Sequence, residues 1–164
     1  MAVQTHTPQR PRTAARLAAV QALFQIDQNA DFADEVIQQF IIYRFNAEQA
    51  QLSYEEGCVP SPDIQLFDSV VKKALLHRGR ITELLKETLP ETWPVERLDP
   101  VLRALFMASM GELLENSIPA PVLINEYMDI AHGFFSGDEP KLVNGVLDTI
   151  TTKLQADTKG HNAD

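Results

Sequence analysis

The sequence predicts an all-α protein of about seven helices in one domain. Apolar residues recur at i, i+3, i+4 and i+7 in one segment after another, which is the period of a helix with one buried face. No segment alternates apolar and polar residues over enough positions to predict a strand. The chain has 164 residues, 45% hydrophobic and 23% charged, a composition typical of one globular domain with its own core.

The first half of the chain predicts three helices. The first runs from an N-cap at Thr13 to about Asn29 and follows a basic arm, residues 1–12, that includes Pro11. A second helix is predicted from about Asp34 and fades in the polar stretch 49–56. The prolines of residues 57–62 predict a loop, after which Asp63 opens a third helix that reaches about residue 75.

The second half predicts four more helices. Gly79 marks a break, and a fourth helix follows over about 81–89. A fifth begins with Asp99 as N-cap and Pro100 as its first residue. The sixth starts near Pro119 with Ile124, Met128 and Ala131 inward, and the seventh covers about 142–154 and leaves residues 155–164 as a frayed polar tail.

The distribution of charge is uneven, although the net charge is −9. No acidic residue precedes Asp27, whereas Arg10, Arg12 and Arg16 all lie in that segment. Nine acidic residues and one basic residue follow between residues 27 and 68. A basic arm on an acidic body can contact nucleic acid, but it is also typical of a solvated tail.

Several classes of protein are excluded or disfavoured by the residues. No apolar run approaches the roughly 18 residues that span a bilayer, and no apolar segment near the start resembles a secretory signal, so we expect a soluble cytoplasmic protein. The sequence has no nucleotide-binding glycine motif and no metal-ligand cluster, so we expect neither cofactor nor metal. Cys58 is the one cysteine, which excludes an internal disulfide. A Cys58/His77 nucleophile pair stays open, but a lone thiol is usually not catalytic, and we expect no enzyme.

Two groups of residues are candidates for RNA contact. Arg10 and Arg12 flank Pro11, and an extended arm would let each guanidinium reach a different phosphate. Phe24 lies eight residues after Arg16 on the first helix, where it could stack on an unpaired base or be buried in the core. A second basic stripe is predicted where Lys73, His77 and Arg80 fall at i, i+4 and i+7.

Three motifs resemble the NusB family. The segment RTAARLAAVQALFQ (12–25) is similar to the family's opening helix, an Arg-rich run that leads into A-V-Q-A-L-[YF]. PAPVLINE (119–126) is similar to the family's P-x-x-V-x-I-N-E, and LVNGVLD (142–148) to its F-V-N-G-V-L-D. The motifs occur in the family's order, and the resemblance covers the chain apart from its two tails.

The resemblance implies a fold of two small packed helical subdomains and a function without catalysis. The family binds the boxA element of nascent ribosomal-RNA leaders together with NusE, a small-subunit ribosomal protein, and suppresses premature termination by RNA polymerase. Its RNA surface is implied to include the N-terminal arm, the aromatic residue of the first helix, and the turn and start of the last helix. In this chain those residues are Arg10, Arg12, Arg16, Phe24, Asp138, Lys141 and Leu142.

The chain departs from the family pattern at four positions. Leu142 replaces a frequent aromatic residue, and Leu102 stands at an acidic position that some members use for NusE. Met107 replaces an Arg, so that Glu126 must find another donor, for which Arg103 is a candidate. Gly111 replaces a Tyr and costs about 1 kcal/mol relative to Ala inside a helix.

These departures leave a second function open, a NusB-like domain kept for protein contact with weakened RNA binding. A third, the N-terminal domain of an RNA cytosine methyltransferase, is disfavoured because 164 residues leave no room for a catalytic domain.

Overall fold

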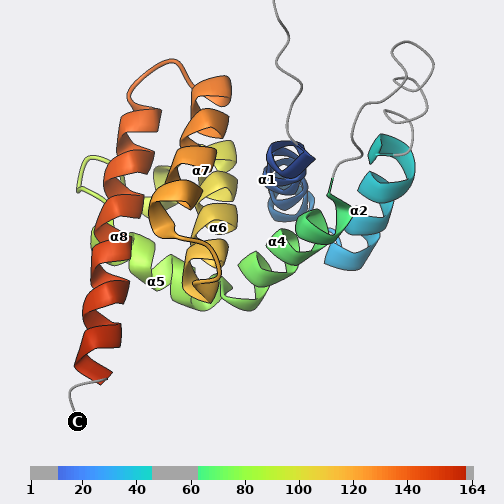
Figure 1. Cartoon of the computed structure of the whole chain (residues 1–164). Helices are drawn as coiled ribbons and strands as arrows, with labels where there is room; N and C mark the ends of the chain where they lie inside the picture. The colour runs from blue at the N-terminus through green and yellow to red at the C-terminus, as the bar shows by residue number, and fades with distance from the viewer. Residues whose placement is uncertain (1–10, 46–62, 162–164) are drawn as a thin grey trace, which may run out of the picture.

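The computed structural model describes residues 11–45 and 63–161, which form seven α-helices and no strand (Figure 1). The helices are α1 (Pro11–Asn29), α2 (Ala33–Gln39), α4 (Ile64–Leu76), α5 (Arg78–Thr88), α6 (Pro100–Glu115), α7 (Ala120–Phe134) and α8 (Glu139–His161). A π-helix, η1 (Phe40–Phe45), continues α2, and a 3₁₀-helix, η2 (Val95–Arg97), precedes α6. The predicted all-α class is confirmed.

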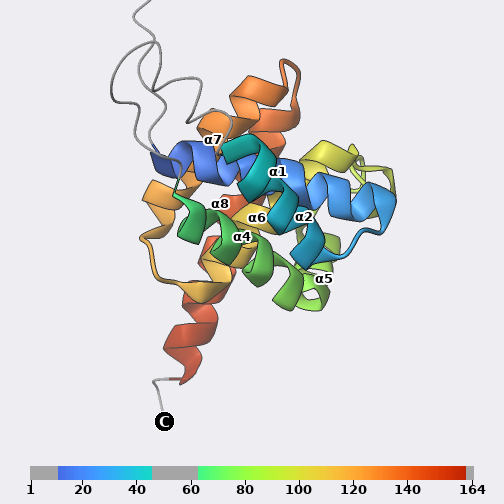
Figure 2. The ribbon, with the colours of Figure 1, turned by 90° about the vertical axis from the view of Figure 1, so that its right-hand side faces the viewer.

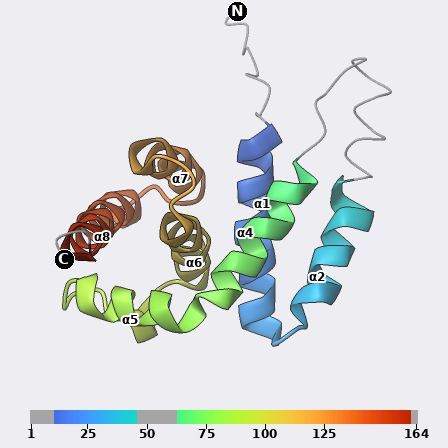
Figure 3. The same cartoon turned by 60° about the horizontal axis from the view of Figure 1, so that its bottom comes forward.

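Helix α6 joins two groups of helices. It packs against α1 and α4 on one side and against α5, α7 and α8 on the other, and Figure 3 shows the two groups apart. Figure 2 shows α1 lying across α4 and α6. Because it has neighbours on both sides, α6 is buried around most of its circumference, from Leu102 to Leu113.

Two of the predicted helix starts are confirmed by their caps. The Asp63 carboxylate accepts a hydrogen bond from Leu66 N at 2.9 Å, and Asp99 accepts one from Val101 N at 2.8 Å. Each cap satisfies a backbone N–H group that the helix itself cannot pair.

Other boundaries differ from the prediction. Helix α1 begins at Pro11 because proline suits the first helical position, so Arg12 is helical and not part of an extended arm. Helix α8 continues to His161, beyond the predicted end near residue 154. The inward face of α7 agrees with the prediction in part: Ala131 is buried as predicted, but Ile124 and Met128 are half-buried. Leu123, Tyr127 and Ile130 are the other buried residues.

Gly111 lies where α6 approaches α4 most closely. A Cβ atom at this position would be 3.0 Å from both the Cα and the N atom of Ala74, which are backbone atoms that cannot rotate away. Gly111 therefore permits this close contact, and its expected helix-propensity cost is offset by packing.

A buried polar cluster links α1, α6 and α7. Arg16 is 3% exposed, and its Nε and Nη2 atoms donate to the two carboxylate oxygens of Glu112 at 2.9 and 3.1 Å. The Tyr127 hydroxyl donates to Glu112 at 2.5 Å, and Arg16 Nη1 lies 3.7 Å from Glu126. Thr13 completes the cluster by donating to Glu126 at 3.0 Å. Glu126 thus finds its donors on α1 and not at Arg103.

Burial and charge act together on the pKa values in this cluster. Burial alone lowers the pKa of Arg16, but its hydrogen bonds to Glu112 and the charge of that carboxylate raise it, with a net upward direction. Burial, followed by the charge of Glu112, raises the pKa of Tyr127 well above its usual value. Tyr127 therefore remains a protonated donor to Glu112, and Arg16 remains charged, throughout the physiological range.

Gly111→Ala is expected to destabilise the protein by about 1–3 kcal/mol, because the added methyl group forces α4 and α6 apart. Gly79→Ala is the matched control, since a Cβ at Gly79 meets nothing within 4 Å. Chemical denaturation of both variants measures the difference. If Gly111→Ala and Gly79→Ala raise the free energy of unfolding equally, the close contact at Gly111 is contradicted.

Arg16→Met is expected to cost about 3–5 kcal/mol of unfolding free energy, because it leaves the Glu112 carboxylate buried with its charge unpaired. Adding Glu112→Gln should recover part of that loss by removing the charge. Urea denaturation of the single and double variants checks this, and two independent, additive losses would show that Arg16 and Glu112 are not coupled.

Candidate nucleic-acid interface

The three arginines of the basic arm have different structural roles. Arg10 lies outside the described residues. Arg12 is exposed on the first turn of α1. Arg16 is buried in the ion pair with Glu112, so the expectation that it contacts phosphate is wrong: packing against α6 turns its side chain inward.

A groove between α1 and α7 begins at Thr13, the residue that follows Arg12. It is a cavity of about 300 Å³ lined by Thr13, Leu17 and Gln21 of α1 and by Asp129, Ile130, Gly133 and Phe134 of α7. The Gln21 Oε1 atom is buried and has no hydrogen-bond partner among the described residues. Phe134 is 36% exposed, so the groove offers a partly exposed aromatic ring.

Phe24 lies one helical turn beyond Gln21. Its ring is half-buried and packs against the core, so that it is neither a fully buried residue nor a free surface aromatic.

The residues predicted from the last helix gather at a second groove. Asp138, Lys141 and Leu142 line a cavity of about 570 Å³ together with Thr88, Pro90, Trp93, Gly145, Val146 and Thr149. Asp138 and Lys141 are exposed, and Leu142 and Trp93 are half-buried. The structure therefore brings together these three predicted residues and adds a tryptophan from the α5–α6 connector.

The second basic stripe does not form one helical face. Helix α4 ends at Leu76 and α5 begins at Arg78, so the i, i+4, i+7 spacing that joined Lys73, His77 and Arg80 crosses a break at His77. Arg80 instead lines a separate cavity against the end of α8.

Acidic partners neutralise part of the same basic stretch. His77 Nε2 lies 2.8 Å from Glu115, and Lys72 Nζ lies 3.0 Å from Asp68. The hydrogen bond from His77 lowers the pKa of Glu115. These pairs make the stretch a weak candidate for binding phosphate.

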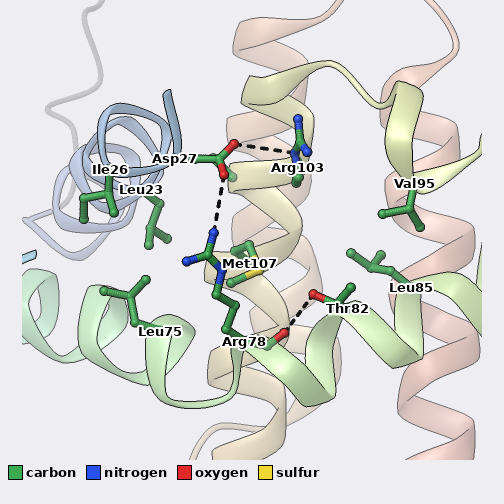
Figure 4. Close-up of a pocket in the computed structure, with 11 residues that line it drawn as sticks. Leu23, Ile26, Asp27, Leu75, Arg78, Thr82, Leu85, Val95, Arg103 and Met107 are labelled. Carbon is green, nitrogen blue, oxygen red and sulfur yellow. Dashed lines mark hydrogen bonds and ion pairs between the residues drawn. The ribbon is translucent and has the colours of Figure 1, made fainter. Parts of the chain in front are cut away.

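A small, partly open pocket lies between α1, the α4–α5 junction and α6 (Figure 4). Its volume is about 170 Å³, and Leu23, Leu85 and Met107 contribute to its apolar wall. Asp27 lies at its rim, 3.6 Å from Arg78 Nη2 and 3.7 Å from Arg103 Nε. Arg103 is thus directed to α1 by Asp27, and Met107, at the family's Arg position, lines an apolar space.

Leu102, predicted as a partner contact, is fully buried. It belongs to the core because α6 is enclosed on both sides, so the structure contradicts its role at a protein surface. Among residues 11–45 and 63–161, no group of three or more His, Cys, Asp or Glu side chains is placed to hold a metal ion. Within the same residues no helix is long and apolar enough to cross a bilayer.

Some residues of these grooves were not identified from the sequence. Gln21, Phe134 and Trp93 carry no motif that separates them from core residues. The spacing of Thr13, Leu17 and Gln21 at i, i+4 and i+8 is a signal for one shared face of α1, but it does not say which helix that face meets.

The comparisons with known proteins agree along nearly the whole chain. Residues 13–152 match the model of the NusB family. The transcription antitermination protein NusB of Gluconobacter oxydans is 49% identical over 144 residues, which cover 88% of each chain. That of Granulibacter bethesdensis is 48% identical over 147 residues, covering 89% of this chain and 90% of the relative.

Solved structures share the fold. T. maritima NusB superposes with a TM-score of 0.65 at 26% identity, covering 87% of this chain and 92% of the other. A crystal structure of the antitermination factors NusB and NusE in complex with dsRNA superposes with a TM-score of 0.66 at 20% identity, covering 88% of this chain and 98% of the other. By sequence and by fold, this chain belongs to the NusB family of transcription antitermination proteins.

Proposed function

We propose that this protein binds the boxA element of nascent ribosomal-RNA leaders together with NusE, and that the complex suppresses premature termination by RNA polymerase in the cytoplasm. It acts by binding and not by catalysis. The observation that carries the proposal is the presence of two exposed cations, Arg12 and Lys141, at the first turns of α1 and α8, next to grooves that contain aromatic residues.

The positions of these cations favour an anionic ligand. The N-terminal end of a helix carries a partial positive charge, so a Lys or Arg there weakens the helix by about 0.3–1 kcal/mol. Helix α1 has no acidic residue in its first turn to compensate. A phosphate bound near Arg12 would relieve this repulsion at the start of α1, whereas α8 has Glu139 in its first turn beside Lys141.

The α1–α7 groove supports contact with bases beside these phosphates. Thr13 follows Arg12 directly, and Phe134 precedes the α7–α8 turn that leads to Lys141. Phe134 lines this groove and is 36% exposed, so it offers a ring for stacking on a base. We include Phe24 in this surface because it continues the α1 face one turn beyond Gln21.

A second candidate, a protein-contact domain with weakened RNA binding, has specific support. The burial of Arg16 and the ion pairs of Lys72 and His77 leave fewer cations for RNA than the sequence suggested. Because the net charge is −9, the protein surface outside these two cations repels RNA. Both points predict that affinity depends on a partner that supplies further positive charge.

Affinity for single-stranded boxA RNA is expected to rise when NusE is added, by more than the affinities of the two separate proteins account for. Fluorescence anisotropy of labelled boxA RNA, titrated with this protein, with NusE and with both, measures this coupling. A scrambled RNA of equal length is the control. If the protein binds NusE yet adds nothing to RNA affinity, the protein-contact function is correct instead.

Replacing Arg12 and Lys141 by Ala should each lower the slope of log K against log salt by about 0.7, the value for one phosphate contact on a single strand. Lys72→Ala is the matched control, because Lys72 is exposed but pairs with Asp68. Titrations of the NusE-containing complex at several salt concentrations provide the slopes. An unchanged slope in both variants would remove these cations from the RNA surface.

A further inference from the structure

The groove at the start of α8 combines features that suit a nucleobase. One wall is the connector between α5 and α6, which lies beside α8 in Figure 1 and contributes Pro90 and Trp93. Trp93 is half-buried, packs against the core and lines the groove. Lys141 stands exposed on the α8 side.

Gly145 leaves the floor of this groove open. It lies inside α8, where glycine is less favourable than alanine, and its helical backbone has no positive φ that would require glycine. A Cβ atom at this position would meet nothing within 4 Å, so close packing does not explain the glycine either. The missing side chain therefore adds space to the groove and has no other role in the described contacts.

We propose that this groove binds one unpaired base of single-stranded RNA, stacked on Trp93, with the adjacent phosphate on Lys141. The inference rests on the proposed function and deepens it, because it assigns to Trp93 the stacking that Leu142 cannot provide. The ring of a tryptophan held by the core can stack on any base with little loss of side-chain freedom.

The charged rim favours a base over a phosphate alone. Asp138 lines the groove together with Lys141, and its carboxylate would repel a phosphate but can accept a hydrogen bond from an exocyclic amino group. A strand that places its phosphate on Lys141 and its base toward Trp93 and Asp138 satisfies both charges.

Trp93 gives the test a direct signal, because it is the one tryptophan of the chain. Single-stranded boxA RNA is titrated into the complex with a tryptophan-free NusE, while Trp emission and the anisotropy of labelled RNA are followed in parallel. We expect the emission to be quenched with the same midpoint as the anisotropy change. RNA that binds without altering Trp emission would overturn the inference and leave the proposed function standing.

A pair of matched variants tests the groove without altering Trp93. Gly145→Leu fills the floor, whereas Gly160→Leu makes the same change in the same helix, where a Cβ also meets nothing within 4 Å. Gly145→Leu should weaken RNA binding by about 5- to 150-fold, the loss of one stacked base, and Gly160→Leu should not. Equal affinity of the two variants would overturn the inference.

Two further outcomes separate the inference from the function on which it rests. If NusE alone changes the Trp93 emission and RNA adds no further change, the groove contacts protein and the inference is wrong. If the wild-type complex does not bind boxA RNA at all, the proposed function fails, and the inference fails with it.

Discussion

The arrangement of this molecule depends on the buried contact between Arg16 and Glu112. The contact joins α1 to α6, and Tyr127 and Glu126 extend it to α7. A carboxylate enclosed by protein must have all its donors in place, so the rotation of α1 about its own axis is fixed within narrow limits. That rotation turns Leu17 and Gln21 toward α7 and leaves Arg12 in solvent. The buried Arg16–Glu112 contact thus determines which side chains α1 presents at the proposed RNA surface, although it is not part of that surface.

Much of the fold could be predicted because its signals are local. The helical period, the Asp63 and Asp99 caps and the proline-containing connector before α6 depend on residues a few positions apart, and each reappears in the structure. The loop predicted over residues 57–62 lies outside the described residues. The register of α7 could not be predicted from periodicity, because Tyr127 is drawn inward by the Glu112 carboxylate of another helix. The need for glycine at position 111 likewise could not be predicted, because it arises from the backbone of Ala74 on another helix, α4.

The candidate site was less predictable because it depends on which side of each helix is covered. Arg12 and Arg16 are both basic residues at the start of one helix, yet one is exposed and the other is buried by α6. Leu102 followed the core pattern of α6, and the structure places it there and not at a partner surface. The turn residues Asp138 and Lys141 were placed by resemblance alone, and their neighbour Trp93 comes from a connector some 45 residues earlier in the sequence.

The length of α8 gives this helix two parts of different local stability. Val143, Val146, Leu147 and Ile150 anchor its first half in the core, whereas residues 155–160 are all exposed. Backbone hydrogen bonds in an exposed terminal turn open with little loss of packing, so the final turns can unwind and re-form without global unfolding. We therefore expect amide protection to be graded along one continuous helix, with the slowest exchange between residues 143 and 150. The end that bears Lys141 adjoins this core-anchored segment, and the exposed terminal turns lie at the opposite end.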